Sequence, residues 1–442
     1  MIGAARSGIA SARFLAQRGA TVALNDRKPL AEWPAEAFAL KTEGVGQIAG
    51  EPPSWLLDQI DLVVVSPGVP TKAIPIRYAD RRGAEVIGEV ELASRFLRGR
   101  IVAITGTNGK TTTTTLIGEM LKDAGMNVQV GGNIGTPLIS MVDSSRDDGW
   151  AVVEVSSFQL ETIVSFRPRI AVVLNITPDH LDRHKTFANY VNAKARIFEN
   201  QRPDDFAVLN ADDPTTAGLT GRTRAPLFWF SRKKEVEKGS FVRSGHILFR
   251  DGKSEREIMP LSENPLKGAH NLENVLAGVS IGALVGCQPA QIREAVRNFK
   301  AVEHRLEFVA KVAGVDYYND SKATNVDATI KALESFPANI HLILGGKDKG
   351  SDYSVLNALL RERVKRVYTI GAAAAKIESQ IAGAEILSSH TLENAIRRAS
   401  ESATTGDIVL LAPACASFDQ FENYEHRGRV FKEIVHSLAA GK

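Results

Sequence analysis

Residues 101–125 limit most strongly what this chain can fold into. Residues 101–105 are apolar and rich in β-branched side chains, which predicts a buried strand. Residues 111–124 carry apolar side chains at helical spacing, and Gly125 follows where a helix end is expected. A polar loop, Gly-Thr-Asn-Gly-Lys-Thr, lies between them. A strand, a glycine loop and a helix in this order predict an α/β domain that cradles a phosphate group.

The loop has the chemistry of a nucleotide site. Lys110 can reach terminal phosphates, and the Thr111 hydroxyl can bind Mg²⁺. The spacing is shorter than the usual G-x-x-x-x-G-K-[ST], because Ile104 stands where the first glycine of that pattern would fall. An ordinary strand-to-helix turn therefore stays open as an alternative. The predicted nucleotide-binding residues of this loop are Gly106, Thr107, Asn108, Gly109, Lys110, Thr111 and Thr112.

Composition narrows the class of protein. A chain of 442 residues predicts about three domains. The net charge of +3, without a basic run that contains aromatic residues, argues against a nucleic-acid partner. Two widely separated cysteines, Cys287 and Cys415, fit a reducing cytoplasm, and neither a membrane-spanning run nor a signal peptide is apparent. We expect a cytoplasmic enzyme or binding protein.

Residues 1–92 predict a small α/β unit. A turn from Gly3 to Gly8 opens a helix, and Asp26 follows the next strand, as in a dinucleotide-binding unit. The second glycine of that pattern is missing, so a structural turn is an equally good interpretation. Only two residues precede Gly3, whereas strands usually have about 5 residues. We therefore expect the native protein to begin upstream, which mass spectrometry of its N-terminus would test.

Residues 93–299 predict the central unit, with further polar side chains after its strands. Glu154 ends the strand 150–153, where a second Mg²⁺ contact is needed, although it could simply face water. His180 follows the strand at 170–174 and could bind metal, although a lone histidine is more often structural. Asn274 is on a helix face where its amide could contact adenine; capping of that helix is an alternative for nearby Asn271. Residues 227–259 predict edge hairpins.

Residues 300–442 predict a third unit with another parallel sheet. Its strands at 315–318, 340–344, 367–370 and 408–411 alternate with helices. Three of them lead into polar loops at 319–325, 345–350 and 413–420, which share one sheet edge and could converge on one ligand. Their lysines and hydroxyls suit a carboxylate-bearing partner.

Three motifs together resemble the Mur ligase family, and the resemblance covers nearly the whole chain. The motifs are Glu-Val-Ser-Ser-Phe-Gln-Leu-Glu at 154–161, Asn-Asp-Ser-Lys-Ala-Thr-Asn at 319–325, and Ala-Pro-Ala-Cys-Ala-Ser-Phe-Asp-Gln-Phe at 412–421. Within the family they resemble the members that add D-glutamate to UDP-N-acetylmuramoyl-L-alanine in peptidoglycan synthesis. The resemblance implies an α/β fold of three domains: a Rossmann-like N-terminal domain, a central P-loop ATPase-type domain and a Rossmann-like C-terminal domain.

The resemblance also implies roles for individual residues. ATP and two Mg²⁺ ions would be the cofactors, with Thr111, Glu154, His180 and a carbamylated Lys194 around the metals, and with Lys110 and Asn133 at the reacting groups. Further contacts to ATP would come from Asn274, Arg305, Asp320 and Lys322. The UDP end of the substrate would bind to Arg6, Ser7, Asp26 and Ser66. D-glutamate would bind to Lys349, Ser417 and Tyr424. The expected enzyme is a cytoplasmic monomer with small-molecule substrates.

Two other functions remain compatible with the sequence. One is a related Mur-type or folylpolyglutamate-type ligase that adds a different amino acid, a choice that the loops at Lys349 and Ser417 would decide. The other is a nucleotide-binding regulator without ligase chemistry. The presence of Glu154, His180 and Lys194 argues against the regulator, because such a protein would need the phosphate loop but not the metal ligands.

Overall fold

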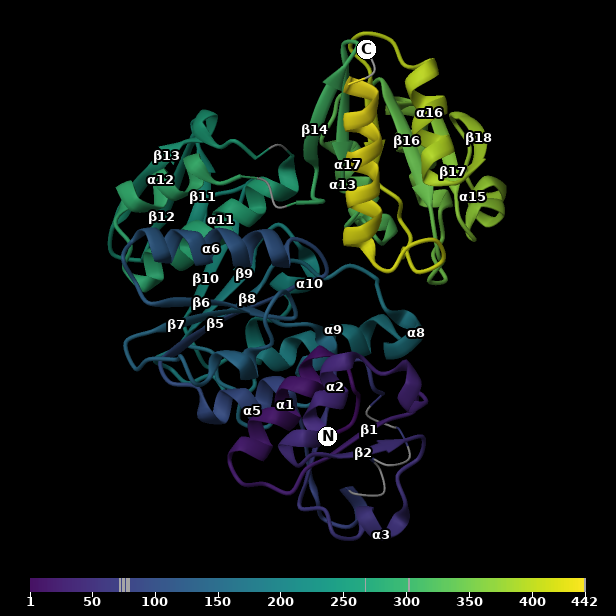
Figure 1. Ribbon diagram of the computed structural model, residues 1–442. Coiled ribbons are helices and arrows are strands. Elements are labelled where there is room, and N and C mark those ends of the chain that lie inside the picture. Colours follow the sequence, from purple (N-terminus) through teal and green to yellow (C-terminus); the bar gives the residue numbers. More distant parts are fainter. Residues whose placement is uncertain (71–72, 74–75, 77–79, 267, 301–302, 441–442) are drawn as a thin grey trace. The chain divides into compact units, whose positions relative to one another are not determined.

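The computed structural model describes residues 1–70, 73, 76, 80–266, 268–300 and 303–440. The chain forms two compact units (Figure 1). The first contains Met1–Glu263 and Glu273–Arg297, and the second contains Asn264–Leu272 and Asn298–Lys442. Each unit has parallel strands with helices between them, which confirms the α/β fold class.

The N-terminal part of the first unit is built from two pairs of parallel strands. They are β1 (Ala23–Asp26) with β2 (Gly46–Ala49), and β3 (Leu62–Val65) with β4 (Glu85–Gly88). Ile2 forms parallel bridges to both Asn25 and Val65, so the first residues of the chain take the strand position between β1 and β3. The helices of this part are α1 (Arg6–Gln17), α2 (Ala35–Ala39), α3 (Ser54–Leu57) and α5 (Glu89–Phe96).

A nine-stranded sheet dominates the rest of the first unit. Its order is β13-β12-β11-β10-β9-β8-β5-β7-β6, parallel from β6 to β11 and antiparallel at β12 and β13. The strands are β5 (Arg100–Thr105), β6 (Val128–Gly132), β7 (Trp150–Glu154), β8 (Ile170–Val173), β9 (Phe206–Asn210), β10 (Leu227–Ser231), β11 (Gly239–Arg243), β12 (His246–Arg250) and β13 (Glu255–Pro260). The predicted edge hairpins are confirmed for β11 to β13, whereas β10 pairs in parallel with β9.

Helices and one continuous core complete this unit. Apolar residues of α1, β3 and α5 join those of β5, β7 and β8 in one cluster, so the N-terminal and central segments share buried surface. The proposed boundary at residue 92 therefore does not interrupt the core, and the boundaries at 92 and 299 stay predictions. The helices are α6 (Lys110–Asp123), α7 (Ser157–Leu160), α8 (Leu181–His184), α9 (Phe187–Ala195), α10 (Pro214–Ala217), α11 (Ala269–Val285) and α12 (Pro289–Asn298).

The second unit contains a six-stranded sheet of order β14-β15-β19-β16-β17-β18, in which only β14 is antiparallel to its neighbour among the described strands. The strands are β14 (Glu307–Val312), β15 (Val315–Asn319), β16 (Ile340–Gly345), β17 (Val364–Ile370), β18 (Glu385–His390) and β19 (Ile408–Leu411). The four predicted strands are confirmed. The edge strands β14 and β18 were not expected, because they are half exposed and carry charged or hydroxyl side chains.

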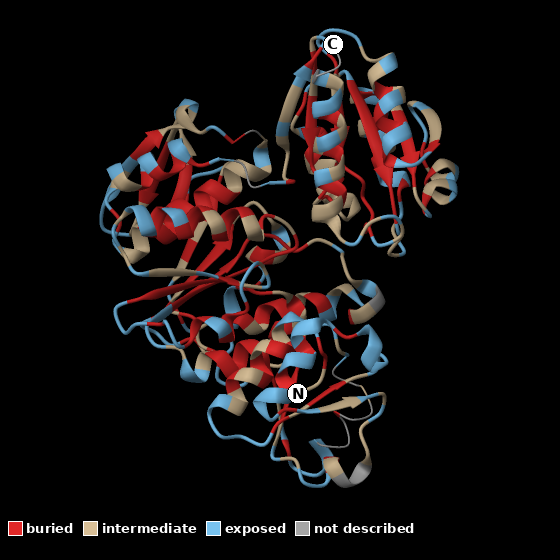
Figure 2. Ribbon diagram, in the orientation of Figure 1, coloured by how far each residue is buried: buried red, intermediate tan, exposed pale blue. Residues whose placement is uncertain are grey.

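Helices cover the strands of the second unit, and short 3-10 helices occur in both units. The helices are α13 (Val326–Glu334), α14 (Asn357–Arg363), α15 (Ala374–Gln380), α16 (Leu392–Ser402) and α17 (Tyr424–Ala440). The 3-10 helices are Leu30–Glu32, Leu40–Glu43, Leu138–Met141, Arg196–Phe198, Thr220–Arg222, Leu261–Glu263 and Ser354–Leu356. Figure 2 shows the central strands as the buried layer and the outer faces of the helices as exposed. Within the described ranges, no helix has the length and apolar character needed to cross a membrane.

Candidate active site

The predicted phosphate loop is present at the carboxyl end of β5. It leads directly into α6, whose first residue is Lys110. Gly109 caps this helix with φ of +85°, and a Cβ atom there would lie 2.2 Å from Oδ1 of Asn274. Only glycine tolerates both the left-handed conformation and this close approach. The short loop therefore needs its glycine. Asn274 of α11 lies against the loop, and its contact with ATP stays a prediction.

Two lysines meet at one carbonyl oxygen of this loop. Lys110 Nζ donates to the carbonyls of Gly106 at 2.9 Å and Thr107 at 2.8 Å. Lys194 Nζ, from α9, donates to the same Gly106 carbonyl at 2.7 Å. Burial, and then the positive charge of Lys110, hold the pKa of the Lys194 ammonium well below its ordinary value, although Asp179 and Glu154 oppose the shift. The amine of Lys194 therefore loses its proton far more readily than a surface lysine.

Glu154 connects the phosphate loop with the loop after β6. It is 2% exposed. Its Oε2 accepts a hydrogen bond of 2.8 Å from the Thr111 hydroxyl, and its Oε1 accepts one of 2.8 Å from Nδ2 of Asn133. The backbone N–H of Asn133 also donates to the Glu154 carbonyl at 2.9 Å. A buried carboxylate beside a threonine hydroxyl offers the hard oxygen atoms that Mg²⁺ prefers, so these residues fit the ion.

His180 lies at the start of α8 in a left-handed conformation with φ of 54°. Its backbone N–H donates to Oδ1 of Asp179 at 2.8 Å, and its Nε2 lies 3.7 Å from Oδ2 of the same residue. Its ring packs edge-on against Phe158, with centroids 5.0 Å apart, and 6.4 Å from the ring of Tyr190. Tyr190 in turn lies 4.7 Å below the Lys194 ammonium. The predicted metal residues thus border one connected set of side chains.

A cavity of about 320 Å³ lies at the carboxyl ends of β1 and β3. Ser7, Asp26 and Ser66 line it, together with apolar Val69 and the proline Pro70. Asp26 accepts a hydrogen bond of 2.8 Å from the backbone N–H of Ala4. Three of the residues predicted for the UDP end therefore share one cavity. The fourth predicted residue, Arg6, is exposed and donates to the Gly135 carbonyl at 3.1 Å, outside this lining.

In the second unit, two predicted ATP residues, Asp320 and Lys322, follow β15, and a third, Arg305, precedes β14 and acts on the charge of Asp320. Asp320 is buried, and burial raises the pKa of its carboxyl group to about 7 against the charge of Arg305. Its Oδ1 accepts a hydrogen bond of 3.3 Å from Leu306 N–H. The Lys322 ammonium lies 3.6 Å above the ring of Tyr424, the first residue of α17. Tyr424, predicted for D-glutamate, therefore neighbours the ATP residues of the same unit.

The loops that carry Lys349 and Ser417 are joined side by side. Lys347 and Ala416 form an antiparallel bridge, with N–H to carbonyl distances of 2.8 and 3.1 Å. The Tyr353 hydroxyl donates to Oδ1 of Asp348 at 2.8 Å and contacts Sγ of Cys415 at 2.9 Å, so one buried side chain spans both loops. Although burial disfavours the charge of Asp348, hydrogen bonds from Lys376 and Tyr353 lower its pKa to about 2. The loops thus present Lys349 and Ser417 at one edge.

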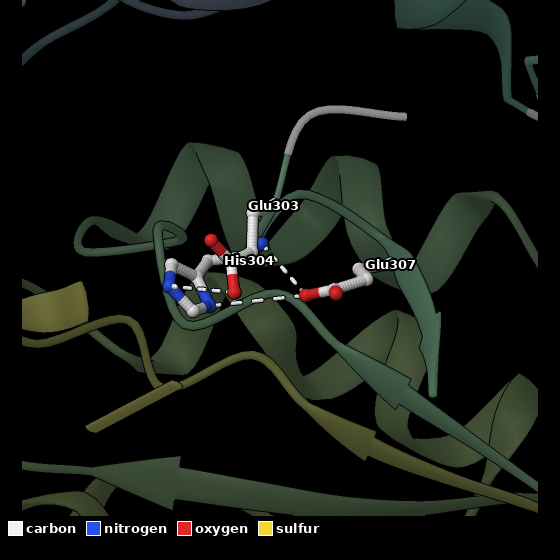
Figure 3. Close-up of side chains that lie close together, drawn as sticks. All are labelled: Glu303, His304 and Glu307. Carbon is white, nitrogen blue, oxygen red and sulfur yellow. Dashed lines mark hydrogen bonds and ion pairs between the residues drawn. The ribbon is translucent and has the colours of Figure 1, made fainter. Parts of the chain in front are cut away.

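Glu303, His304 and Glu307 form the one group in the described residues whose ligand atoms are close enough for a metal ion (Figure 3). The Lys432 ammonium pairs with both carboxylates, at 2.8 and 2.6 Å. Asn319 Nδ2 fills the space between His304 Nδ1, at 2.9 Å, and Glu307 Oε2, at 3.1 Å. Lys432 thus supplies a positive charge between the two carboxylates, and the group fastens residues 303–307 to α17.

Comparison with known proteins supplies the family. A model described as "Mur ligase middle domain" matches residues 104–282, one described as "Mur ligase, glutamate ligase domain" matches 304–415, and one described as "Mur ligase MurD-like, N-terminal domain" matches 1–88. The chain belongs to the Mur ligase family. The three matches follow one another along this Mur ligase, as expected for its three α/β domains.

Relatives match the Mur ligase over its whole length. A protein from Koribacter versatilis named UDP-N-acetylmuramoylalanine–D-glutamate ligase is 58% identical, covering 99% of this chain and 97% of the relative. A protein of the same name from Pelotomaculum thermopropionicum is 51% identical, covering 100% and 98%. Among solved structures, a pseudomurein peptide ligase type C from Methanothermus fervidus has a TM-score of 0.64 at 18% identity, over 99% of both chains. MurF ligase from Thermotoga maritima in complex with ADP has a TM-score of 0.61 at 18% identity, over 86% of this chain and 99% of that one. These structures share the fold.

The site of this Mur ligase also contains residues that the sequence did not identify. The Asn175 amide holds the backbone of Asn108 through its Oδ1 at 2.8 Å and its Nδ2 at 3.1 Å. The Tyr190 hydroxyl lies 3.2 Å from Oγ1 of Thr107. Helical spacing could have revealed Tyr190, because it is one turn before Lys194 on α9. No local signal marks Asn175, because its partner is 67 residues away.

Proposed function

We propose that this Mur ligase joins D-glutamate to UDP-N-acetylmuramoyl-L-alanine in peptidoglycan synthesis, with ATP as the energy source. The observation that carries the proposal is the buried Glu154 carboxylate, bonded to Thr111 of the phosphate loop and to Asn133 at the same time. This contact joins a nucleotide-binding loop to a second loop that can face an acceptor. Nearly full-length relatives with the name of that ligase support the choice of substrates.

The phosphate loop would bind the terminal phosphates of ATP. Backbone N–H groups at the start of α6 and the ammonium of Lys110 supply positive potential there. Thr111 and Glu154 would hold Mg²⁺, and His180 would contribute to a second ion. Bound Mg²⁺ would screen the charge between the two reacting anions. Asn274, against Gly109, would contact the adenosine. Arg305, Asp320 and Lys322 are further proposed ATP contacts.

The reaction follows from the poor reactivity of a carboxylate toward amines. A carboxylate oxygen of the alanyl group attacks the γ-phosphorus of ATP, ADP leaves, and an acyl phosphate forms. The neutral amine of D-glutamate then attacks the acyl carbon, so that a C–N bond forms and the bond to phosphate oxygen breaks. Inorganic phosphate leaves, and a proton passes from the nitrogen to solvent. Lys110 and Asn133 would orient and stabilise the groups whose negative charge changes.

Lys194 is proposed to carry a carbamate. Formation of a carbamate requires a neutral amine, and the lowered pKa of Lys194 supplies that form. The modification would place a negative charge beside the ammonium of Lys110, which attracts it, whereas Lys110 disfavours a charged ammonium on Lys194. The carbamate oxygens would then be suited to bind metal. Tyr190, under the Lys194 ammonium, would limit where the modified side chain can lie.

The remaining assignments concern the two outer domains. Ser7, Asp26 and Ser66 would bind the uridine diphosphate end in the 320 Å³ cavity. Arg6, outside the lining of this cavity, is assigned to the same end of the substrate. Lys349, Ser417 and Tyr424 would bind D-glutamate. We assign residues 1–92 to the UDP-substrate, 93–299 to ATP and 300–442 to the amino acid, in a monomeric cytoplasmic enzyme.

Release of phosphate tests the function. We expect phosphate release from ATP to require both UDP-N-acetylmuramoyl-L-alanine and D-glutamate, with one new amide formed per phosphate. Omission of each substrate in turn is the control, and a panel with L-glutamate and lysine tests the amino acid. Release without the UDP-substrate would indicate a simple ATPase. Equal turnover with another amino acid would replace D-glutamate in the proposal.

A further inference from the structure

A second large cavity opens at the opposite edge of the central sheet. Its volume is about 570 Å³, and it lies entirely within the first unit. The first residues of four strands line it: Arg100 of β5, Trp150 of β7, Ile170 of β8 and Phe206 of β9. Since β5 rises about 3.3 Å per residue, this amino edge is about 17 Å from the phosphate loop. The cavity is therefore separate from the proposed ATP site.

Cations outnumber anions in the cavity lining. Arg100, Arg167 and Arg169 line it, against Asp204 and Asp205. Arg167 pairs with Asp205 at 2.7 Å, and Arg169 pairs with Asp204 at 2.8 Å. Arg100 is therefore the arginine in excess, and it is exposed. Within the described part of the chain, the guanidinium of Arg100 makes no ion pair; its one recorded contact is with an aromatic ring.

Aromatic rings lie close to two of these guanidinium groups. Arg100 lies 5.3 Å from the ring centroid of Trp150, and Arg169 lies 5.3 Å from that of Phe206. The apolar side chains of Leu97 and Leu284 also line the cavity. A guanidinium plane over an aromatic face can accept a further planar group by stacking, while its N–H groups bind phosphate or carboxylate oxygens. The volume is in the range of small-molecule sites.

We propose that this cavity binds a small organic anion in which a planar ring carries a phosphate or carboxylate group. The anion pairs with the guanidinium of Arg100, and the ring lies against Trp150 and the neighbouring apolar side chains. Asp204 and Asp205 keep Arg167 and Arg169 in place. This site does not depend on the ligase reaction, because none of its lining residues belongs to the proposed active site.

Phenyl phosphate is the probe, and the fluorescence of Trp150 is the readout. We expect a saturable change with a dissociation constant below about 1 mM, which corresponds to about 4 kcal/mol. Inorganic phosphate, which lacks the ring, and phenol, which lacks the charge, should each bind at least tenfold more weakly. Trp150→Phe should remove the signal and so assign it to this cavity.

Two variants and one control decide where the probe binds. Arg100→Ala should weaken phenyl phosphate binding at least tenfold, whereas Arg98→Ala should leave it unchanged, because Arg98 is exposed and outside the cavity lining. Lys110→Ala should also leave it unchanged. The proposal is wrong if phenyl phosphate does not saturate the signal, if Arg100→Ala binds as the unmodified chain does, or if Lys110→Ala abolishes binding. Melting temperatures establish that the variants are folded.

Discussion

Replacement of Glu154 by glutamine separates the chemical role of this residue from its structural role. The change keeps the size of the side chain but removes its charge. One of the two oxygens that accept from Thr111 and Asn133 becomes an NH₂ group, which cannot accept a hydrogen bond. The Thr111 hydroxyl can rotate and accept a hydrogen bond from this NH₂ group, so the bond to Thr111 survives with its direction reversed. The bond from Asn133 then goes to a neutral amide oxygen instead of a carboxylate. Since charge-assisted bonds contribute about 1.5–3 kcal/mol and neutral ones about 0.5–1.5, we expect a loss of about 1–3 kcal/mol of stability.

The expected loss of activity is much larger than this loss of stability. Removal of one group that stabilises charge in a transition state typically reduces the rate by about 10²–10³, or about 2.7–4 kcal/mol. Amide formation at saturating ATP should therefore fall by that factor in Glu154→Gln. The Mg²⁺ concentration for half-maximal rate should rise, because a carboxylate ligand is lost. The assays are coupled phosphate release over a Mg²⁺ series and thermal melting.

Glu119→Gln is the matched control, because Glu119 lies on the same helix as Lys110 but is exposed. It should leave both the rate and the Mg²⁺ dependence unchanged. If Glu154→Gln retains activity within tenfold of the unmodified enzyme and the same Mg²⁺ dependence, then Glu154 does not hold the metal. A fall in melting temperature that matches the fall in activity would show that the residue acts through folding alone.

Three further predictions follow from the site and its surroundings. Lys194→Ala should abolish amide formation, bicarbonate should not restore it, and a short-chain carboxylic acid should restore part of it; full activity of the variant would refute the carbamate. Gly109→Ala should weaken ATP binding at least tenfold, as measured by calorimetry. The φ of +85° costs an alanine about 1–2 kcal/mol, and the alanine Cβ would lie 2.2 Å from Oδ1 of Asn274. An unchanged affinity would contradict the predicted loop. Burial raises the pKa of Glu89 from 4.5 to about 7, so the stability it contributes is complete below pH 4 and is lost as pH rises to 7. Glu89→Gln should therefore be more stable than the unmodified chain at pH 8, by up to about 3 kcal/mol. No gain in melting temperature there would show that burial does not penalise the charged Glu89 carboxylate.

Much of the fold could be predicted from local patterns. The strands β5, β7 and β8 agree with their predicted positions within one or two residues. Their apolar periods and the residues that end them lie close together in sequence. The role of Ile2 between β1 and β3 could not be seen, because a single bridging residue has no period. The edge strands β14 and β18 were missed because half-exposed strands lack a continuous apolar run.

The candidate site shows a similar division. Lys110 and Thr111 could be predicted because both belong to the loop motif itself and directly follow Gly109. The shared carbonyl of Gly106 could not be predicted, since Lys194 is 88 residues away in sequence. The same is true of the Asn133 contact to Glu154 and of Tyr353, which spans the Asp348 and Cys415 loops.

The sequence by itself determined the phosphate loop, the alternation of strands and helices, and the family motifs, because turn chemistry and hydrophobic period act between neighbouring residues. Only the tertiary structure decided which distant side chains share an environment. Parallel strands connected by helices bring their carboxyl ends to one edge, and there burial lowers the pKa of Lys194 and holds Glu154 between two loops. Charge and burial are set by everything packed around a group, and packing exists only once the chain has folded.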